Sequence, residues 1–401
     1  MSDRSRILFV PPRFARDLAG GAENLVRSLA LSCHYAGCAV EVATTCATDN
    51  ERWMNALPEG TTQEVGITVH RFPVDRRNVH RHRRLTQRLD RDGTLDALDA
   101  ADLLATSVWS SALQRFIDAQ GERFDAIAFA PYLFGTTFWG AQSWPERTII
   151  IPCLHDEPMA HLPPIANVLR SARALAFNSR GEQALAQRIL GPIRGTVVGM
   201  GFTAPSAPPP AGFAERHGLG RYFLYAGRIE QGKRVDIAAR YVAALAREVD
   251  PSLQLVLIGR GSWRPPPDVA PFVLRVGFVD DDEKRSAMAG AVALVNPSEA
   301  ESLSIVLLES WLEETPALVA AGSEVMVDHC RRSGGGIPFD DEASFRAAAH
   351  ALMDSRESAR AMGRMGRDYV LTEYSTGAVT ARFLALVHSV RKDGRRGDSF
   401  E

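Results

Sequence analysis

Cysteine is scarce in this chain, and the few cysteines that it has show no motif spacing. The 401 residues include five of them, without a C-x-x-C pair: Cys33, Cys38, Cys46, Cys153 and Cys330. An odd number of widely spaced thiols excludes a disulfide framework and a cysteine-based zinc framework. We expect these residues to be reduced and mostly buried, as in a cytoplasmic protein.

Long apolar runs and a strong excess of one charge are also missing. No run reaches the length of a membrane span, and the N-terminus has only the short apolar run 7–10, where a signal peptide would need a longer core. The net charge of −2 argues against a nucleic-acid-binding protein. With 45% apolar and 23% charged residues the sequence is typical of a soluble globular protein, and its length predicts two domains.

Short apolar runs alternate with longer helical patterns along the chain, which predicts an α/β protein with parallel sheets covered by helices. The main break is segment 204–212, which is too rich in proline for a helix or a central strand. We therefore predict two Rossmann-like domains, residues 1–203 and 221–375, joined by a linker at 204–220. The Arg- and Asp-rich residues 392–401 are predicted to form a disordered tail.

Two carboxylates flank one apolar run in the second half. Glu301 and Glu309 are separated by seven residues, in a segment that predicts a strand at 291–295, a polar turn and a helix. We expect Glu301 in or near the turn and Glu309 about two turns into the helix; at roughly 100° per residue, their side chains would lie within about 80° of one another. The helix start offers unpaired N–H groups to a phosphate. A ligand with hydroxyls and a diphosphate, such as a nucleotide sugar, would fit, although two glutamates on a surface helix are more often simply solvated.

A pair of cations follows the first strand of the second half. The predicted strand 222–226 ends at Gly227, and Arg228 and Lys233 come directly after it. A glycine lets a ligand approach the backbone closely, and two cations at the carboxyl end of a parallel sheet suit a diphosphate leaving group. Ordinary loop cations are the alternative.

The first half has two polar loops behind strands. Gly20 and Gly21 lie between strand 7–10 and a helix, and His155 follows strand 148–152. A double glycine is commonly only a turn, and a lone histidine is commonly a structural hydrogen-bonding residue. Their position at the carboxyl ends of strands favours a ligand-binding cleft.

Together these segments resemble the motifs of the retaining glycosyltransferases of family 4, in order along nearly the whole chain. The resemblance rests on an E-x7-E motif at 301–309, a G-R-x-x-x-x-K motif at 227–233, a G-G-x-E loop at 20–23 and two turns at 257–261 and 276–279. It implies the GT-B fold, in which two Rossmann-like domains face each other across a cleft and a C-terminal helix, here about 376–391, crosses back to the first domain. The implied reaction is a metal-independent transfer of a hexosyl group by front-face displacement.

The resemblance also assigns roles to residues. Glu309 would hold the ribose hydroxyls, Glu301 the sugar hydroxyls, and Arg228 and Lys233 the diphosphate. The predicted catalytic residues are Glu301, His155, Arg228 and Lys233. The other predicted donor-binding residues are Gly21, Gly227, Gly259, Phe278, Val279, Ser302, Leu303, Ser304, Ile305 and Glu309. The acceptor is expected along the first domain, near Gly21, His155 and Tyr132.

Two features bear on the donor pocket. Ser302 and Ser304 stand where the family has glycines, and their side chains are expected to narrow the pocket. The run Asp280, Asp281 and Asp282 could suggest a metal site, but we interpret it as the N-terminal cap of a helix at 283–289. We expect no metal and no other cofactor, the nucleotide sugar being a co-substrate.

The segment 76–91 is strongly basic, with seven arginines and two histidines. It could be a solvated helix or a mobile loop. It could also form a basic rim that meets an anionic membrane, at the inner face of the plasma membrane, or a phosphorylated acceptor. Few large apolar residues interleave with the arginines, so such a membrane contact would be electrostatic and salt-sensitive.

The sequence thus predicts a cytoplasmic retaining glycosyltransferase of polysaccharide or glycoconjugate biosynthesis. Its donor would be a nucleotide-diphosphate sugar, and its acceptor a glycan, a lipid-linked sugar or a small molecule. Two alternatives remain open: a sugar-nucleotide epimerase on the same fold, and an inactive scaffold that binds a nucleotide sugar.

Overall fold

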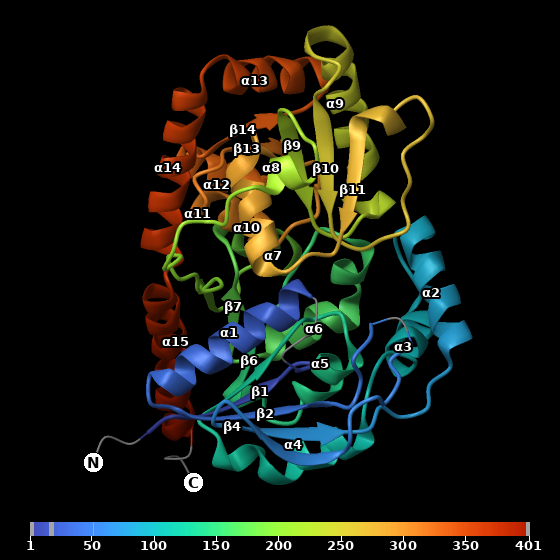
Figure 1. Cartoon of the computed structure of the whole chain (residues 1–401). Helices are drawn as coiled ribbons and strands as arrows, with labels where there is room; N and C mark the ends of the chain where they lie inside the picture. Colours follow the sequence, from blue (N-terminus) through green and yellow to red (C-terminus); the bar gives the residue numbers. More distant parts are fainter. Residues whose placement is uncertain (1–3, 16–19, 51, 398–401) are drawn as a thin grey trace. The chain divides into compact units, whose positions relative to one another are not determined.

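The computed structural model describes residues 4–15, 20–50 and 52–397, apart from the side chains of 392–397. The chain divides into two compact units, which Figure 1 shows in the colours of the sequence. Unit 1 comprises Met1–Gly201 with Thr376–Glu401, and unit 2 comprises Phe202–Ser375. The last helix therefore belongs to unit 1, although the whole of unit 2 precedes it in the sequence.

Unit 1 is built on an eight-stranded sheet of order β3-β4-β2-β1-β5-β6-β7-β8. All neighbouring strands are parallel except β3 and β4. The strands are β1 (Arg6–Val10), β2 (Ala39–Thr45), β3 (Gly60–Glu64), β4 (Ile67–Phe72), β5 (Ala126–Phe129), β6 (Thr148–Ile150), β7 (Ala174–Phe177) and β8 (Gly195–Val197). The order reverses between β1 and β5, so the loops that follow β1, β5 and β6 come out at the edge where such sheets bind ligands.

Helices cover both faces of this sheet. Because neighbouring residues of a strand point to opposite faces, strand β1, which is buried from Ile7 to Val10, needs a partner on each side. Phe9 stacks on Phe383 of the last helix, with ring centroids 5.6 Å apart, while Leu8 and Val10 belong to the core on the other face. The helices are α1 (Gly21–Tyr35), α2 (Val79–Asp92), α3 (Ala97–Ala105), α4 (Ser111–Gln120), α5 (Gly135–Gly140), α6 (Pro163–Ser171), α7 (Arg180–Leu190) and α15 (Thr376–Gly397). Short 3-10 turns lie at η1 (Gly121–Arg123), η2 (Pro145–Arg147) and η3 (Pro158–His161).

Unit 2 is built on a six-stranded parallel sheet of order β11-β10-β9-β12-β13-β14. The strands are β9 (Tyr222–Ala226), β10 (Gln254–Ile258), β11 (Val273–Gly277), β12 (Leu294–Asn296), β13 (Ala317–Ala320) and β14 (Gly336–Phe339). The order reverses between β9 and β12, as in a dinucleotide-binding fold. The two loops that follow β9 and β12 therefore lie side by side at the carboxyl edge, and these loops carry the predicted donor-binding residues.

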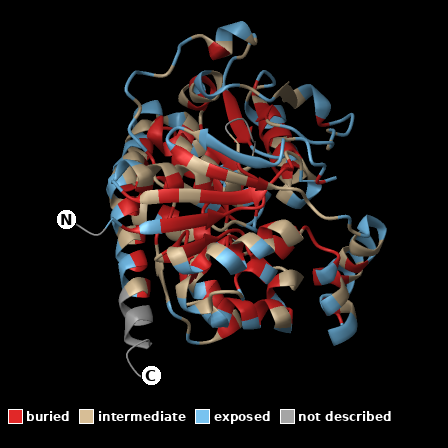
Figure 2. Cartoon of the chain, turned by 90° about the horizontal axis from the view of Figure 1, so that it is seen from below, coloured by how far each residue is buried: buried red, intermediate tan, exposed pale blue. Residues whose placement is uncertain are grey.

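The sheet of unit 2 is also covered on both faces. Phe223 and Tyr225 of β9 pack in one core with apolar residues of α9 and α13, and Trp311 of α11 is fully buried against α14. The central strands β9, β10 and β13 are almost entirely buried. Figure 2 colours the whole chain by burial and shows red concentrated on strands and on inward faces of helices, with pale blue on outer helix faces and loops. The helices are α8 (Phe213–Arg216), α9 (Val235–Val249), α10 (Asp281–Gly290), α11 (Ile305–Leu312), α12 (Glu324–Ser333), α13 (Glu342–Asp354) and α14 (Arg356–Glu373), with 3-10 turns at η4 (Gln231–Lys233) and η5 (Ala270–Phe272).

The predicted linker at 204–220 needs correction. The boundary between the units lies earlier, between Gly201 and Phe202. Residues 204–212 have no helix or strand, as their prolines require, but the following residues belong to unit 2. Phe213 is buried with its ring 5.8 Å from that of Tyr222, and His217 lies 3.3 Å from Glu283. The linker is thus shorter than its composition suggested.

The predicted tail is corrected in part. Residues 392–397 continue α15, and residues 398–401 lie outside the described residues. Within the described part of the chain, no helix combines the length and the apolar character that crossing a bilayer would need.

Candidate functional site

Three glycines shape the carboxyl edge of the sheet in unit 2. Gly227, Gly259 and Gly277 end β9, β10 and β11, and their backbones pack directly on one another: the Gly227 amide donates to Ile258, and the Gly259 amide donates to Gly277 at 2.8 Å. Gly259 has a φ of 135°, and a Cβ there would lie 1.9 Å from the Gly227 carbonyl oxygen. Only glycine fits this position, so a bare backbone surface lies beside the loop that carries the predicted cations.

Lys233 and Glu301 meet at the point where the strand order reverses. The Nζ of Lys233, at the end of η4, donates to Glu301 Oε1 at 2.8 Å, to the Ala300 carbonyl at 3.1 Å and to Ser298 Oγ at 3.3 Å. Both charged side chains are mostly shielded from solvent, which strengthens their attraction. Two residues that are 68 positions apart in the sequence, both predicted to bind the donor, thus form one ion pair.

Arg228 stands at the same edge but is far more exposed. Its backbone carbonyl accepts from the buried Tyr225 hydroxyl at 2.6 Å, and burial raises the pKa of that hydroxyl. The guanidinium is 64% exposed and pairs with Glu230 at 3.2 Å. The backbone of Arg228 is therefore held in place while its charge remains accessible to a ligand.

The start of α11 differs from an ordinary helix start. Ser304 precedes the helix with a φ of 61°, a left-handed conformation that glycine adopts most easily. Its hydroxyl does not cap the helix but bonds with Asn296 Nδ2 at 3.0 Å, and both residues are buried. The side chain that replaces a glycine is thus turned inward, and Leu303 is buried as well. In the first helical turn the amides of Leu307 and Leu308 donate to the Ser304 carbonyl, whereas the first two amides, those of Ile305 and Val306, have no acceptor within the helix.

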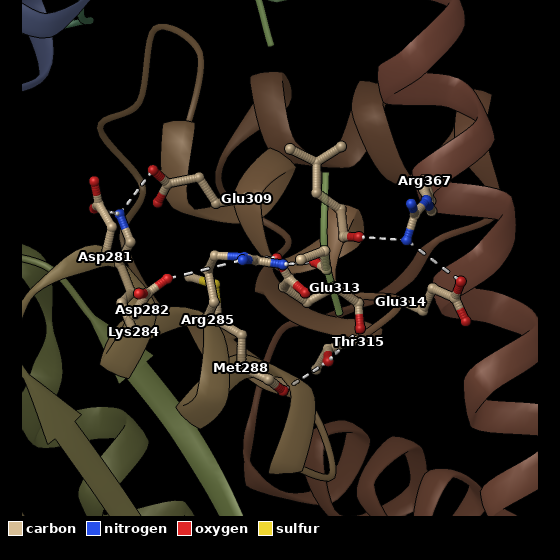
Figure 3. Close-up of polar contacts among 12 residues, drawn as sticks. Asp281, Asp282, Lys284, Arg285, Met288, Glu309, Glu313, Glu314, Thr315 and Arg367 are labelled. Atoms are coloured by element: carbon tan, nitrogen blue, oxygen red, sulfur yellow. Dashed lines mark hydrogen bonds and ion pairs between the residues drawn. The ribbon is translucent and has the colours of Figure 1, made fainter. Parts of the chain in front are cut away.

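Glu309 lies closer to the helix start than predicted. It is the fifth residue of α11, about one turn from the N-terminus, because the helix begins only at Ile305. Its Oε1 accepts from Lys284 Nζ at 2.9 Å, and Lys284 also contacts Asp281 at 3.2 Å (Figure 3). Burial alone would lower the pKa of Lys284, but the carboxylates of Glu309 and Asp281 outweigh it and raise the pKa. Glu301 and Glu309 are therefore bound by two different lysines, and Lys284 is a site residue that our sequence analysis missed.

Phe278 and Val279 follow β11 at the outer edge of the sheet. The Phe278 ring is 61% exposed, and the Arg260 guanidinium lies over it, 4.6 Å from its centroid. Val279 is half-buried beside it. A planar cation stacked on an exposed ring forms a flat surface, which suits a planar ligand such as a nucleobase.

In unit 1, the double glycine opens α1. Gly20 precedes the helix and Gly21 is its first residue. The side chain of Glu23 folds back over Gly20, where a Cβ would lie 2.1 Å from Glu23 Oε2, and Glu23 is held by Arg13 Nε at 3.0 Å. The preceding residues 16–19 lie outside the described part of the chain.

His155 lies in the loop that follows β6. Its Nδ1 is 3.7 Å from Glu157 Oε1, and Glu157 accepts the Tyr132 hydroxyl at 2.6 Å. The neighbouring Asp156 pairs instead with His161, at 2.8 Å. Tyr132 is buried and supports the loop through Glu157, and the expectation that an acceptor lies near it stays a prediction.

Glu182 anchors the same loop from inside the protein. It lies in the first turn of α7, is completely buried, and accepts from the amides of Leu154 (2.6 Å) and Asn178. Burial raises the pKa of Glu182 to about 8, although the donated hydrogen bonds oppose the rise. One carboxyl group thereby ties together the loops that follow β6 and β7.

Of the three consecutive aspartates, Asp280 is the N-cap of α10, whereas Asp281 and Asp282 are its first two residues, so the helix begins two residues earlier than predicted. Asp280 Oδ1 accepts from the Glu283 amide at 2.8 Å, whereas Asp281 and Asp282 pair with Lys284 and Arg285 of the next turn. Among the described residues, no group of three or more His, Cys, Asp or Glu side chains is arranged to hold a metal ion.

The basic segment of unit 1 forms α2 and its preceding loop. Two of its arginines bind aspartates near or on α3: Arg81 contacts Asp102 at 2.5 Å, and Arg88 contacts Asp99. Arg83 and Arg84 are exposed, and neither forms an ion pair with a described residue. The basic rim predicted from the sequence is therefore narrower than the segment itself, because α3 neutralises its inner side.

The family model for Glycosyl transferases group 1 matches residues 220–355, which include the whole carboxyl edge of unit 2 described above. No curated protein matches the sequence.

Solved structures with the same architecture extend over nearly the whole chain. Sucrose-phosphate synthase from Thermosynechococcus elongatus is 18% identical and has a TM-score of 0.70, with 96% of this chain and 99% of that chain covered. A trehalose-6-phosphate protein from E. coli, bound with UDP-2-fluoro glucose, is 13% identical with a TM-score of 0.69 and the same coverage. HepE from Anabaena, in complex with UDP and glucose, is 13% identical with a TM-score of 0.66, covering 96% of this chain and 100% of that one. The predicted fold class, an α/β protein with the two parallel sheets of GT-B proteins, is thus confirmed.

Proposed function

We propose that the protein is a retaining glycosyltransferase that takes a hexosyl group from a nucleotide-diphosphate sugar. The observation that carries this proposal is the ion pair of Lys233 with Glu301 at the switch point of a sheet that matches a glycosyltransferase family model. Similar structures contain UDP, UDP-glucose or UDP-2-fluoro glucose, which supports a nucleotide sugar as the donor. The acceptor would be a glycan, a lipid-linked sugar or a small molecule.

In the proposed reaction, the bond between the anomeric carbon and the diphosphate oxygen breaks. An acceptor oxygen forms the new bond on the same face of the sugar, and its proton passes to the leaving phosphate. Lys233 and Arg228 would neutralise the charge that grows on the leaving diphosphate, so that no metal ion is needed. Glu301 would accept hydrogen bonds from the sugar hydroxyls and Glu309 from the ribose, each held by its own lysine.

His155 of unit 1 would act on the reacting sugar. The imidazole is oriented by Glu157, and its loop is fixed by Glu182, so the ring would be preorganised. Gly21 at the start of α1 would leave room for the substrates.

The donor site is tested by thermal shift with UDP-, GDP-, ADP- and dTDP-sugars in the presence of EDTA. A donor at 100 times its Kd should stabilise the protein by about 2.7 kcal/mol. Lys233→Ala and Glu309→Gln should each weaken binding tenfold or more, because a hydrogen bond to a charged group contributes about 1.5–3 kcal/mol. Arg240→Ala, on the outer face of α9 where it pairs with Asp236, is the control and should bind like wild type. A wild type that none of these sugars stabilises would contradict the proposal.

Product analysis separates the two rival functions. An epimerase would convert the donor to another nucleotide sugar without an acceptor, whereas a transferase would release nucleoside diphosphate when an acceptor is supplied. A scaffold would bind the donor without turnover on any acceptor.

We also propose that the outer face of α2 contacts an anionic membrane surface. Arg83 and Arg84 carry charge that no described residue neutralises, and Leu98 at the start of α3 is 84% exposed. Each arginine contributes about 1 kcal/mol at an anionic surface, so Arg83→Gln with Arg84→Gln should weaken binding to phosphatidylglycerol-containing vesicles about 30-fold. The charge-matched control is Arg331→Gln with Arg346→Gln, in which both residues are paired and lie in unit 2. Equal vesicle binding by the two double variants would refute this contact.

A further inference from the structure

Unit 1 has a groove that none of the roles proposed above uses. It has a volume of about 300 Å³ and is lined by Trp109, Gln114, Trp139, Gln142 and Ser143. Trp109 precedes α4, Gln114 lies on α4, Trp139 lies on α5, and the last two residues follow α5. We call this site the indole groove.

The two indole rings form an angled wall. Their centroids are 6.5 Å apart and their planes differ by 57°, so they are not stacked on each other. Trp139 is 36% exposed, and its ring makes an edge-to-face contact with the ring of Phe138, with centroids 4.7 Å apart. A partly exposed tryptophan offers an apolar face whose π cloud attracts C–H groups.

The polar residues of the groove are already arranged. Gln114 Nε2 donates to Ser143 Oγ at 2.7 Å and to Asp118 at 3.1 Å, and Ser143 donates to Asp118 at 2.6 Å. Gln142 Nε2 donates to the Phe138 carbonyl at 2.7 Å. These bonds use both N–H donors of Gln114 and one of Gln142, and they leave the two amide oxygens as acceptors for a ligand hydroxyl.

One donor of the groove lacks an acceptor. The Nε1 of Trp109 is shielded from solvent and makes no hydrogen bond with a described residue. A buried N–H without an acceptor costs about 1–3 kcal/mol, and a ligand oxygen that reached this atom would remove that cost. The position of Trp109 is fixed independently, because its carbonyl accepts from the Asp75 amide at 3.0 Å.

We propose that the indole groove binds a neutral sugar chain and so retains the acceptor glycan on unit 1. The role of the bound sugar chain as an acceptor rests on the proposed transferase function. The binding of a sugar chain is argued only from the residues that line the groove. Sugar rings present C–H faces to aromatic rings and hydroxyls to amide oxygens. The groove offers both aromatic rings and amide oxygens, and none of its lining residues is charged. The volume is at the lower end of small-ligand sites, which suits a short stretch of glycan.

The lining argues against other partners. A nucleic acid would need basic residues, which the groove lacks. A peptide that extends a sheet would need an open strand edge, whereas the groove is formed by helices and their turns.

The test uses the full-length protein and three probes, maltohexaose, cellohexaose and laminarihexaose, observed by saturation-transfer NMR and tryptophan fluorescence. At least one probe should bind the wild type. Trp139→Ala should weaken that binding at least tenfold, and Trp109→Phe, which removes the indole N–H, should also weaken it. Tyr35→Ala removes an exposed aromatic of α1 outside the groove and should bind like wild type. Donor thermal shifts should be equal in all four proteins, which also shows that the variants are folded.

Each outcome of this test either supports or overturns the proposed sugar site. No binding of any probe by the wild type, or unchanged binding in Trp139→Ala, overturns the sugar site. Loss of vesicle binding in Trp139→Ala without any oligosaccharide binding would show a membrane contact instead. Sugar binding that depends on Trp139, without any donor shift, would leave the groove standing and refute the transferase.

Discussion

The buried carboxyl of Glu182 should make the stability of unit 1 depend on pH in an unusual direction. Its pKa is raised by burial from an ordinary 4.5 to about 8, so the folded protein binds this proton more tightly than the unfolded chain does. The stabilisation is therefore fully present below pH 4.5 and is lost as the pH rises through 8. At about 1.4 kcal/mol per pH unit, the two limits differ by about 5 kcal/mol.

Glu182→Gln isolates this contribution, because the amide does not titrate but keeps an acceptor for the Leu154 amide. Between pH 5 and pH 7.5 the stability of the wild type should fall relative to this variant by about 3 kcal/mol. For a unit of this size, that corresponds to a relative change in Tm of about 6–12 °C, which scanning fluorimetry at the two pH values can measure. Glu146→Gln, a half-exposed carboxylate of the same unit, should show no such change.

A difference that does not change with pH would refute the argument. If the wild type instead became more stable relative to Glu182→Gln as the pH rises, the hydrogen bonds donated by the backbone amides would outweigh burial and keep Glu182 ionised. The same variant should lower the turnover number more than it changes donor binding, because Glu182 fixes the loop of His155.

Three further predictions concern unit 2. Gly259→Ala should destabilise the protein by about 3 kcal/mol or more in urea unfolding, because the added Cβ would overlap the Gly227 carbonyl. Gly232→Ala is the control and should be nearly neutral, because a Cβ there meets nothing within 4 Å. Equal losses of stability in the two variants would contradict this prediction. Ser304→Gly should be more stable than Ser304→Ala by about 1 kcal/mol. Both variants lose the hydrogen bond to Asn296, but only glycine adopts the left-handed backbone conformation of this residue without strain. Equal stabilities would show that this conformation is not strained. Lys284→Met should weaken donor binding less than tenfold in the thermal-shift titration, and less than Glu309→Gln does, because Lys284 orients the carboxylate without contacting the ribose; a larger effect would make it a direct ligand.

Much of the architecture follows from local sequence pattern. The apolar runs of β1, β9 and β12 are bounded by polar or glycine-rich turns, and the helix around Leu25 and Leu29 buries the side that its spacing predicts. Asp280 caps α10, as its place before a helical pattern predicts. These features depend on neighbouring residues, and so they can be inferred from a short window of sequence.

The predictions that failed concern features that depend on contacts between segments far apart in the sequence. Phe213 looked like part of a linker because of the prolines before it, but burial against Tyr222 draws it into unit 2. Glu309 lies about one turn into its helix and not two, because the helix begins at Ile305, directly after the left-handed Ser304.

The sequence by itself determined the two-unit α/β plan and the residue types at the donor edge, because strand and helix periodicity, glycine turns and clustered charges are local properties. Only the tertiary structure decided which charges meet. Lys233 and Glu301 come together because the strand order reverses between β9 and β12, and Lys284 reaches Glu309 because α10 and α11 pack side by side. Tertiary contacts also decide which arginines of α2 are paired. Aspartates on α3 and at its N-cap bind Arg81 and Arg88, whereas Arg83 and Arg84 stay exposed. Electrostatic partners are set by distances of a few ångströms between remote segments, and those distances exist only once the sheet order and the helix packing are in place.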